Sequence, residues 1–332
     1  MKFDEFQETF REALEKAVRE SGDALTVKPC SIAKLNYGER EAYTLVPKGT
    51  ASSTGPLFYL EDCYLQHLQG YSIEEILSRG LEKERDFMDA KREFLTRPDT
   101  FAWEKIKDKV FVITYGYEKN QKLLDQFPHI RRKDFAATYH ILLEQGEDSY
   151  SHIAITNSIA VKLGIGVAEL HETAVQNSMR WMPDTLESIS DVFQTLQPDE
   201  NQRAEELEGF LESPPFPLDV LTNTKRNLGA SVIFYPGVLE RIGEKYPEGY
   251  YLLPSSIHEL MVIPKMQGSS WRTCEEIVRE INQTTVSPSD FLSDHVHAYD
   301  PSRKHLLMGA EIDLLERMKP SRPKPALEGR KR

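Results

Sequence analysis

The spacing of hydrophobic residues predicts a helix at the start of the chain and another near residue 72. Apolar side chains recur three or four positions apart, with acids and bases between them, at Phe3, Phe6, Phe10, Leu14 and Val18. This period is typical of an amphipathic helix. Ser72-Ile73-Glu74-Glu75 then forms a capping box, in which the Ser72 side chain accepts from the Glu75 amide while Glu75 reaches back.

The rest of the N-terminal part adds only two short strands to this helical pattern. Residues 43–46 and 57–59 have the composition of strands. Residues 81–107 are highly charged and predict a solvated helix that breaks near Pro98. We therefore expect residues 1–105 to be mainly helical.

The middle of the chain combines predicted strands with predicted helices. Residues 110–115, 135–143 and 151–155 have strand patterns. After Gly164-Ile165-Gly166, apolar positions at helical spacing predict two helices, whose faces are marked by Val167, Leu170, Ala174 and Trp181, and by Leu186, Ile189, Phe193 and Leu196.

The strongest folding pattern lies in residues 219–264. Segments 230–235, 250–253 and 257–263 predict three strands around a short helix, and Pro236 suits the first position of that helix. From residue 260 to residue 263 both faces are apolar, which indicates an interior strand covered on each side.

Further elements are expected beyond this region. Trp271, Cys274 and Val278 mark the apolar stripe of a helix. Residues 287–290 have the pattern of a capping box, and residues 296–299 and 305–308 can close a hairpin with a four-residue turn.

Together these elements predict an α+β protein, with a mixed sheet flanked by helices and a mostly helical N-terminal part. We expect three regions: a helical segment over 1–105, an α+β body over 106–312, and a short helix with a disordered basic tail over 313–332. The acidic, proline-ended stretch near 197–217 is the expected linker within the body.

Composition and charge narrow the classes of function. With 332 residues and 39% hydrophobic content, the chain is long enough for one large or two ordinary folded domains. A net charge of −12 argues against a nucleic-acid surface, because phosphate binding needs clustered Lys and Arg. No stretch has the length and apolarity of a membrane span, and no secretory signal follows Met1, so we expect a soluble, cytoplasmic protein.

The sequence lacks the familiar motifs of metal, nucleotide and redox chemistry. The three cysteines are far apart and form no metal-binding pair. Two His-Glu pairs lack the second histidine of a zinc protease, since Val175 and Val262 stand one helical turn later. Gly164-Ile165-Gly166 lacks the third glycine of a dinucleotide site, where Glu169 stands. We expect no cofactor.

Two groups of residues remain as candidates for chemistry. In the first, Ser255, Ser256, His258 and Glu259 follow Pro254; they could supply a nucleophile and base, or simply form a turn in which the hydroxyls capture backbone amides. In the second, Asp294, His295, His297 and His305 lie close to Asp300 and include two histidines on one face of a predicted strand, so they could hold a metal ion or could be ordinary polar residues of a hairpin.

The sequence LPSSIHELMVIP, at residues 253–264, resembles an uncharacterised domain-of-unknown-function family from intestinal bacteria of the Clostridia type. Residues 59–77, 110–130 and 151–178 fit the same resemblance, which reaches to about residue 310. It implies a bacterial protein and carries no catalytic residue, ligand or partner over to this chain.

We therefore expect a non-enzymatic binding or protein-interaction protein. Its partner is unknown, and another bacterial protein is one candidate. The alternative is a hydrolase or a metal-assisted enzyme, which would use the 255–259 turn or the 294–305 cluster.

Overall fold

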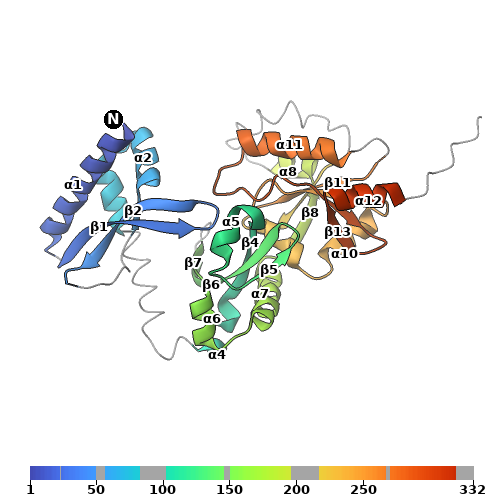
Figure 1. Ribbon diagram of the computed structural model, residues 1–332, viewed down its shortest axis with the longest axis horizontal. Helices are drawn as coiled ribbons and strands as arrows, with labels where there is room; N and C mark the ends of the chain where they lie inside the picture. Colours follow the sequence, from blue (N-terminus) through green and yellow to red (C-terminus); the bar gives the residue numbers. More distant parts are fainter. Residues whose placement is uncertain are drawn as a thin grey trace, which may run out of the picture. The chain divides into compact units, whose positions relative to one another are not determined.

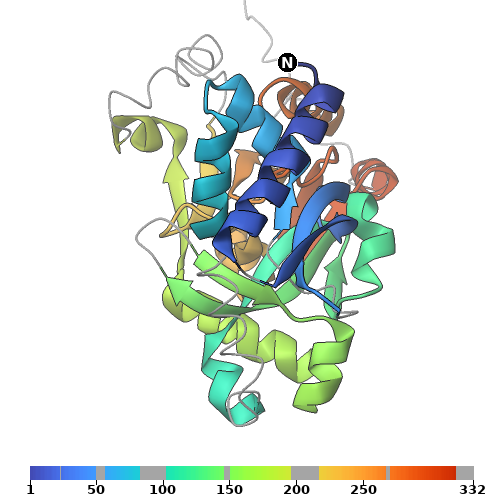
Figure 2. The same ribbon diagram turned by 90° about the vertical axis from the view of Figure 1, so that its left-hand side faces the viewer.

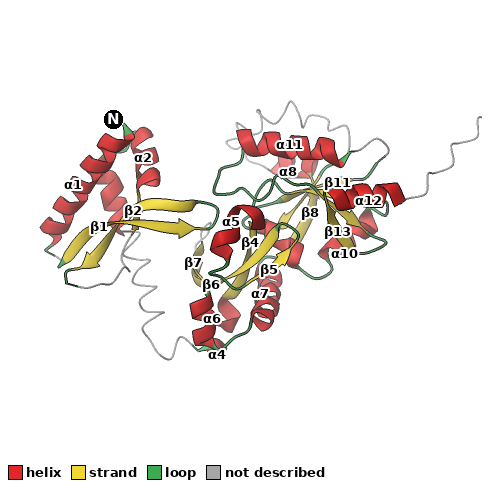
Figure 3. Cartoon of the chain, viewed as in Figure 1, coloured by secondary structure: helices red, strands yellow, loops and turns green. Residues whose placement is uncertain are grey.

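A computed structural model describes residues 1–22, 24–49, 57–82, 102–145, 150–195, 217–266 and 270–318 (Figures 1 and 3). By its internal contacts the chain divides into two compact units. Unit 1 comprises Met1–Pro183 with Ser287–Phe291, and unit 2 comprises Asp184–Val286 with Leu292–Arg332. The division at residues 105 and 312 expected from the sequence stays a prediction.

The N-terminal part of unit 1 is a helix followed by a sheet, so the prediction of a mostly helical segment is wrong. Its elements are α1 (Phe3–Ser21), β1 (Leu25–Lys34), β2 (Gly38–Pro47), β3 (Leu57–Tyr59), α2 (Leu60–Leu68) and helical residues 73–82. The three strands form an antiparallel sheet in the order β1-β2-β3. β1 gave no strand signal because it is an edge strand, contains Pro29 and buries none of its residues fully.

Helices α1 and α2 pack on one face of this sheet, as Figures 1 and 2 show. The predicted stripe of α1 forms the core: Phe6, Phe10, Leu14 and Val18 are buried against Tyr43 and Leu45 of β2. The predicted capping box is also confirmed, because Ser72 Oγ accepts from the Glu75 amide at 3.2 Å while the Ser72 amide donates to Glu75 at 2.8 Å.

The second sheet of unit 1 is built around one long central strand. Its strands are β4 (Val110–Gly116), β5 (His129–Arg132), β6 (Phe135–Gln145) and β7 (Tyr150–Ala154). All pair antiparallel with β6: β4 along one edge, β5 and β7 along the other. The helical segments around it are α4 (Trp103–Ile106), η1 (Lys107–Lys109), α5 (Tyr117–Leu124), α6 (Asn157–Leu163) and α7 (Val167–Trp181).

Helix α7 covers one face of this sheet and completes the hydrogen bonds of its edge strand. Ser178 Oγ accepts from the Val112 amide at 3.0 Å, and Asn177 donates to the Val110 carbonyl at 2.9 Å. The opposite face carries Phe111 and Tyr115 of β4 beside Ala136 and His140 of β6, by strand register.

Unit 2 contains a six-stranded sheet in the order β13-β12-β10-β11-β9-β8. Its strands are β8 (Asp184–Ser188), β9 (Asp219–Asn223), β10 (Tyr250–Leu253), β11 (Leu260–Pro264), β12 (His297–Asp300) and β13 (His305–Met308). Every pairing is antiparallel, as in the other two sheets, so the predicted mixed sheet is wrong while the α+β class is confirmed. β11 is an interior strand, as its two apolar faces predicted.

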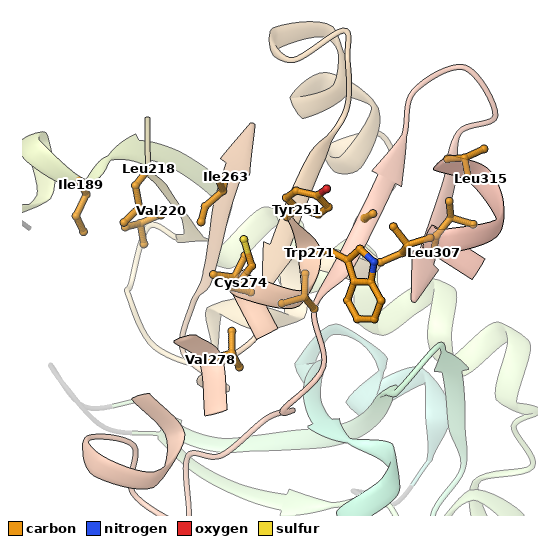
Figure 4. Close-up of a cluster of buried hydrophobic side chains, with 14 residues drawn as sticks. Ile189, Leu218, Val220, Tyr251, Ile263, Trp271, Cys274, Val278, Leu307 and Leu315 are labelled. Carbon is orange, nitrogen blue, oxygen red and sulfur yellow. The ribbon is translucent and has the colours of Figure 1, made fainter. Parts of the chain in front are cut away.

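Helices cover both faces of this sheet. On one face lie α8 (Ile189–Thr195), α11 (Trp271–Thr284) and α12 (Ala310–Met318), whose apolar residues pack with Tyr251, Ile263 and Leu307 (Figure 4). On the other lies α10 (Val238–Lys245), where the Tyr250 hydroxyl donates to the Leu239 carbonyl at 3.0 Å.

Four local predictions after residue 183 are wrong. Leu186, expected on the face of a helix, lies in strand β8, and the helix begins only at Ile189. Residues 230–235 belong to the 3-10 helix η3 (Gly229–Phe234) rather than to a strand, because every residue of η3 is buried and an apolar run carries no period when both sides are covered. α10 begins after an N-cap at Gly237, so Pro236 precedes the helix. Residues 288–290 form a turn without a helix after it.

Three further predictions fall largely outside the described residues. They are the charged helix over 81–107, the linker near 197–217 and the basic tail at the end of 313–332.

Candidate functional site

Three chain segments of unit 2 converge at the turn that carries the first group of candidate residues. The turn lies between β10 and β11, and the loop after β9 packs against it. The segment before β12 joins them: the Ser293 amide donates to the Pro254 carbonyl at 3.0 Å, and the Leu292 amide to the Ser255 carbonyl at 3.4 Å. The start of the second candidate group therefore lies beside the first.

His258 holds the loop after β9 through two hydrogen bonds. Its Nδ1 accepts from the Leu228 amide at 3.2 Å, and its carbonyl accepts from Thr222 Oγ1 at 2.7 Å. Because Nδ1 acts as an acceptor, the ring carries its proton on Nε2.

Ser256 stabilises the same turn. Its side chain is buried, and its Oγ accepts from the His258 amide at 3.0 Å. This is a serine turn, in which a hydroxyl captures a backbone amide two residues on. Ser255 and Glu259 are half-buried next to it. The arrangement shapes the chain between β10 and β11. It corresponds to the alternative in which the serine hydroxyls form a turn.

Gly229 makes the close approach of these segments possible. A Cβ atom built on Gly229 would collide with Thr222 Oγ1 and the His258 carbonyl, and would lie 2.9 Å from the Asn223 amide nitrogen. Two of these three atoms belong to the backbone and cannot rotate away. Glycine at this position is therefore required by contact, since its φ lies outside the left-handed range.

The second candidate group is spread over different partners. Asp294 accepts from Asn282 of α11 at 2.8 Å, and His295 Nδ1 lies 3.5 Å from a Glu275 carboxylate oxygen on the same helix. His297 is fully buried and pairs with Leu252 in register, on the sheet face opposite to α11. His305 is exposed on β13.

Asp300 organises the hairpin between β12 and β13. Its carboxylate accepts from the Ser302 amide at 3.0 Å and from Arg303 at 2.9 Å. Burial acts against ionisation, but these hydrogen bonds outweigh it and hold the pKa of Asp300 below its ordinary value. The described parts of the chain place no three His, Cys, Asp or Glu side chains where they could hold a metal ion together.

The buried cysteines have the character expected of small hydrophobic residues. Burial raises the pKa of the Cys63 thiol to about 12 and that of Cys274 to about 11. Both therefore stay protonated at neutral pH, and a thiol is a poor nucleophile.

Unit 1 contains a pair of histidines that no sequence pattern indicated. His140 of β6 and His152 of β7 lie with their Nδ1 atoms 3.2 Å apart, and His140 Nε2 lies 3.0 Å from Thr138 Oγ1. The Thr138 hydroxyl donates to the Ile113 carbonyl at 3.2 Å, so it accepts from His140 Nε2–H. His140 Nδ1 is then an acceptor, and His152 Nδ1–H donates to it.

This chain of hydrogen bonds fixes both rings in the neutral form. Burial lowers the pKa of His140 well below its ordinary value, and the neighbouring His152 lowers it further. Burial and then the charge of Lys34 lower the pKa of His152 to about 4. Pairing residues 135–143 with residues 151–155 in the observed register would have brought the two histidines together, but neighbouring residues do not fix that register.

Comparison with known proteins gives one result. The model of a protein family of unknown function, DUF5688, matches residues 3–301. Neither the curated proteins nor the solved structures contain a match to this chain. Among its described helices, none has both the length and the apolarity to cross a membrane. Since the match covers most of the sequence, the chain belongs to the DUF5688 family of proteins of unknown function.

Proposed function

We propose that this chain is a non-enzymatic protein-interaction protein that docks a partner on helix α2. The observation that carries this proposal is a pair of leucines exposed on one side of that helix. Leu65 is 57% exposed and Leu68 is 61% exposed. Residues three apart on a helix share a face, so the two side chains form a continuous apolar strip.

Aromatic packing on the other side of α2 fixes the helix against α1. Tyr64 packs on Phe3 and Phe6, with ring centres 5.1 and 5.2 Å away, and its hydroxyl donates to the Met1 carbonyl at 3.0 Å. Met1, held beside α2 in this way, is itself 51% exposed. We name Met1, Leu65 and Leu68 the α2 strip. A rigid apolar surface loses little conformational entropy on binding.

The charges near the α2 strip indicate the chemistry of the partner. Asp4 and Glu5 are exposed in the first turn of α1. Glu61 and Asp62 are exposed in the first turn of α2, where they share the cation Arg40 at 3.3 and 2.8 Å. The whole chain carries a net charge of −12. The complementary surface is an apolar patch bordered by Lys and Arg, since opposite charges at an interface rim speed association and exclude wrong partners.

The enzymatic alternative has less support. In the 255–259 turn, His258 Nδ1 and Ser256 Oγ already accept hydrogen bonds from backbone amides, so these atoms stabilise the turn.

The assignment of the family to intestinal bacteria of the Clostridia type, with LPSSIHELMVIP as its signature, is a proposal that rests on resemblance.

A Leu65→Lys/Leu68→Lys variant tests the interaction proposal. Two positive charges would replace apolar contact and repel a basic rim, so we expect capture of the partner to fall at least about 10-fold. The tagged full-length chain and the variant are compared by quantitative affinity purification from cells that make the protein. The variant keeps its melting temperature, because both side chains are exposed.

Val161→Lys is the matched control, since Val161 is an exposed apolar residue (80%) on α6. We expect this variant to capture the same partner as the wild-type chain, and capture to weaken as salt rises. The proposal fails if the wild type enriches no protein above the Leu65→Lys/Leu68→Lys variant, or if Val161→Lys loses the partner equally.

A further inference from the structure

The tip of the β1–β2 hairpin covers the face of the second sheet that carries the histidine pair. Leu35 at the tip packs in one cluster with Ala136 of β6, Leu124 of α5 and Tyr115 of β4. Ala136 and His140 lie on the same face of β6, four positions apart. Lys34 is close enough for its charge to act on His152. All these residues belong to unit 1.

Four hydrogen bonds fasten the tip in place. The Asn36 amide donates to Asn120 Oδ1 at 2.6 Å, and Asn120 Nδ2 donates to Asn36 Oδ1 at 2.8 Å. Asn36 Nδ2 also donates to the carbonyls of Ser289 and Phe291, at 2.7 and 2.9 Å. Asn36 and Asn120 are both buried. None of these amide groups titrates, so they hold the tip equally at neutral and at acidic pH.

The histidine pair adds a contribution that does depend on pH. In the neutral pair, His152 donates to His140, and the sheet, Phe111 and Tyr115 surround the rings. A proton taken up on His152 Nε2 creates an imidazolium in a half-buried ring. A proton on His140 Nδ1 would instead set two N–H groups against each other and break the pair.

The other ionisable groups around this face do little to neutralise such a charge. Among the described residues, those on this face by register or by contact are Lys34 on β1, Tyr37 in the hairpin turn, Tyr115 on β4, His129 and Arg131 on β5, Lys119 on α5 and Asp290 in the segment that Asn36 binds. Lys34, Lys119 and Arg131 are cations, and Asp290 is the carboxylate of this set. A protonated pair is therefore repelled by its surroundings.

We propose that the β1–β2 hairpin tip is an acid-sensitive strap, which is released from the second sheet when the His140–His152 pair takes up a proton. Release hydrates the imidazolium and separates it from Lys34, and it uncovers the apolar face around Ala136 and Tyr115. The proton comes from solvent and no covalent bond changes. The hairpin keeps its own strand pairing, since β1 and β2 pair along all ten residues of β1.

The direction of the pH effect follows from the protonation of His152. The pKa of His152 is about 4 in the docked state, and it rises toward its ordinary value when release admits water and removes the charge of Lys34. The released state thus binds more protons, so docking is strongest above about pH 6.5 and weakens as the pH falls toward 4. Between pH 7.5 and pH 4.5, His152 alone raises the opening constant by up to about 70-fold, the limit reached when the released ring is fully hydrated.

Hydrogen exchange of the Asn36 amide tests the proposal, because that amide is protected by Asn120 only while the strap is docked. After correction for intrinsic exchange, we expect its opening constant in the full-length chain to rise between about 10-fold and about 70-fold from pH 7.5 to pH 4.5. Amides in the β1–β2 pairing and in β10 of unit 2 stay protected over the same range.

Two variants and one control separate the strap from general acid unfolding. His140→Leu/His152→Leu removes the titrating pair, so the pH dependence disappears. Lys34→Glu places a carboxylate beside the imidazolium and reduces the rise to under about 10-fold. His305→Leu, which replaces an exposed histidine of unit 2, behaves as the wild type.

A flat pH profile at the Asn36 amide in the wild type would overturn the proposal. So would a simultaneous loss of protection in β10, which would mean global unfolding. If His140→Leu/His152→Leu does not fold, Lys34→Glu decides: a rise as large as that of the wild type contradicts the strap.

Discussion

A Gly229→Ala variant is expected to lose about 3 kcal/mol or more of the free energy of unfolding of unit 2. The added Cβ would collide with Thr222 Oγ1 and the His258 carbonyl, and it would press on the Asn223 amide. To make room, the loop after β9 must move away from the 254–259 turn. That movement breaks the hydrogen bonds from Leu228 and Thr222 to His258.

Urea denaturation of the full-length chain measures this loss. In a Trp103→Phe/Trp181→Phe background, Trp271 of unit 2 is the one remaining tryptophan among the three of the chain, so its fluorescence reports on unit 2. Gly309→Ala is the control within unit 2, because a Cβ there meets nothing within 4 Å. Its φ of +52° is left-handed, so in the same background we expect a loss of about 1 kcal/mol from backbone strain alone. Equal losses in the free energy of unfolding would show that the collision of the added Cβ at Gly229 does not cause the loss.

Asn120→Ala is expected to destabilise unit 1 by about 3 kcal/mol. The substitution removes the acceptor of the Asn36 amide and the donors to Asn36 Oδ1 and the Gly116 carbonyl. These groups are buried, so water does not replace the lost partner without opening the structure. Each buried polar group that loses its partner costs about 1–3 kcal/mol.

The change is measured by hydrogen exchange of β4 and β6 amides in the full-length chain under native conditions. Asn157→Ala provides the control, since Asn157 is exposed and donates a single side-chain bond, to the Asp125 carbonyl at 2.8 Å. We expect this control to cost less than about 1 kcal/mol. A loss in Asn120→Ala no larger than in Asn157→Ala would refute the role of the amide contacts.

Elements with an uninterrupted period could be predicted from the sequence. Each of these elements depends on residues that are close in the sequence. They are the apolar stripe of α1, the capping box at Ser72 and the hairpin of β12 and β13. The interior position of β11 followed from its two apolar faces. In each case local pattern and tertiary packing agree, so the pattern alone is sufficient.

The errors arose where distant contacts decide the structure. η3 has the composition of a strand, yet it forms a 3-10 helix beside the 254–259 turn, where the Ala230 amide donates to the Ile257 carbonyl at 3.1 Å. β1 is long but only half-buried, so its alternation is weak. Neither the partner of η3 nor the edge position of β1 is encoded in neighbouring residues.

The candidate site residues also divide into those whose contacts are local and those whose partners are distant in the sequence. Ser256 and His258 could be recognised as a turn, because the serine bonds the amide two residues on. The partner of His258 Nδ1 is thirty residues away and could not be predicted. His140 and His152 were missed because they meet across a hairpin, where register and not sequence distance sets the contact.

The central claim is that the distinctive LPSSIHELMVIP segment folds a turn, in which His258 works through Nδ1 as an acceptor. Comparing His258→Asn with His258→Gln by urea denaturation, in the same single-tryptophan background, tests it most directly. The Asn side-chain oxygen can take the place of Nδ1, whereas that of Gln reaches further, toward Nε2. We expect His258→Asn to stay within about 1 kcal/mol of the parent and His258→Gln to lose about 2 kcal/mol. Equal stability of the two variants, or a larger loss in His258→Asn, would contradict the claim.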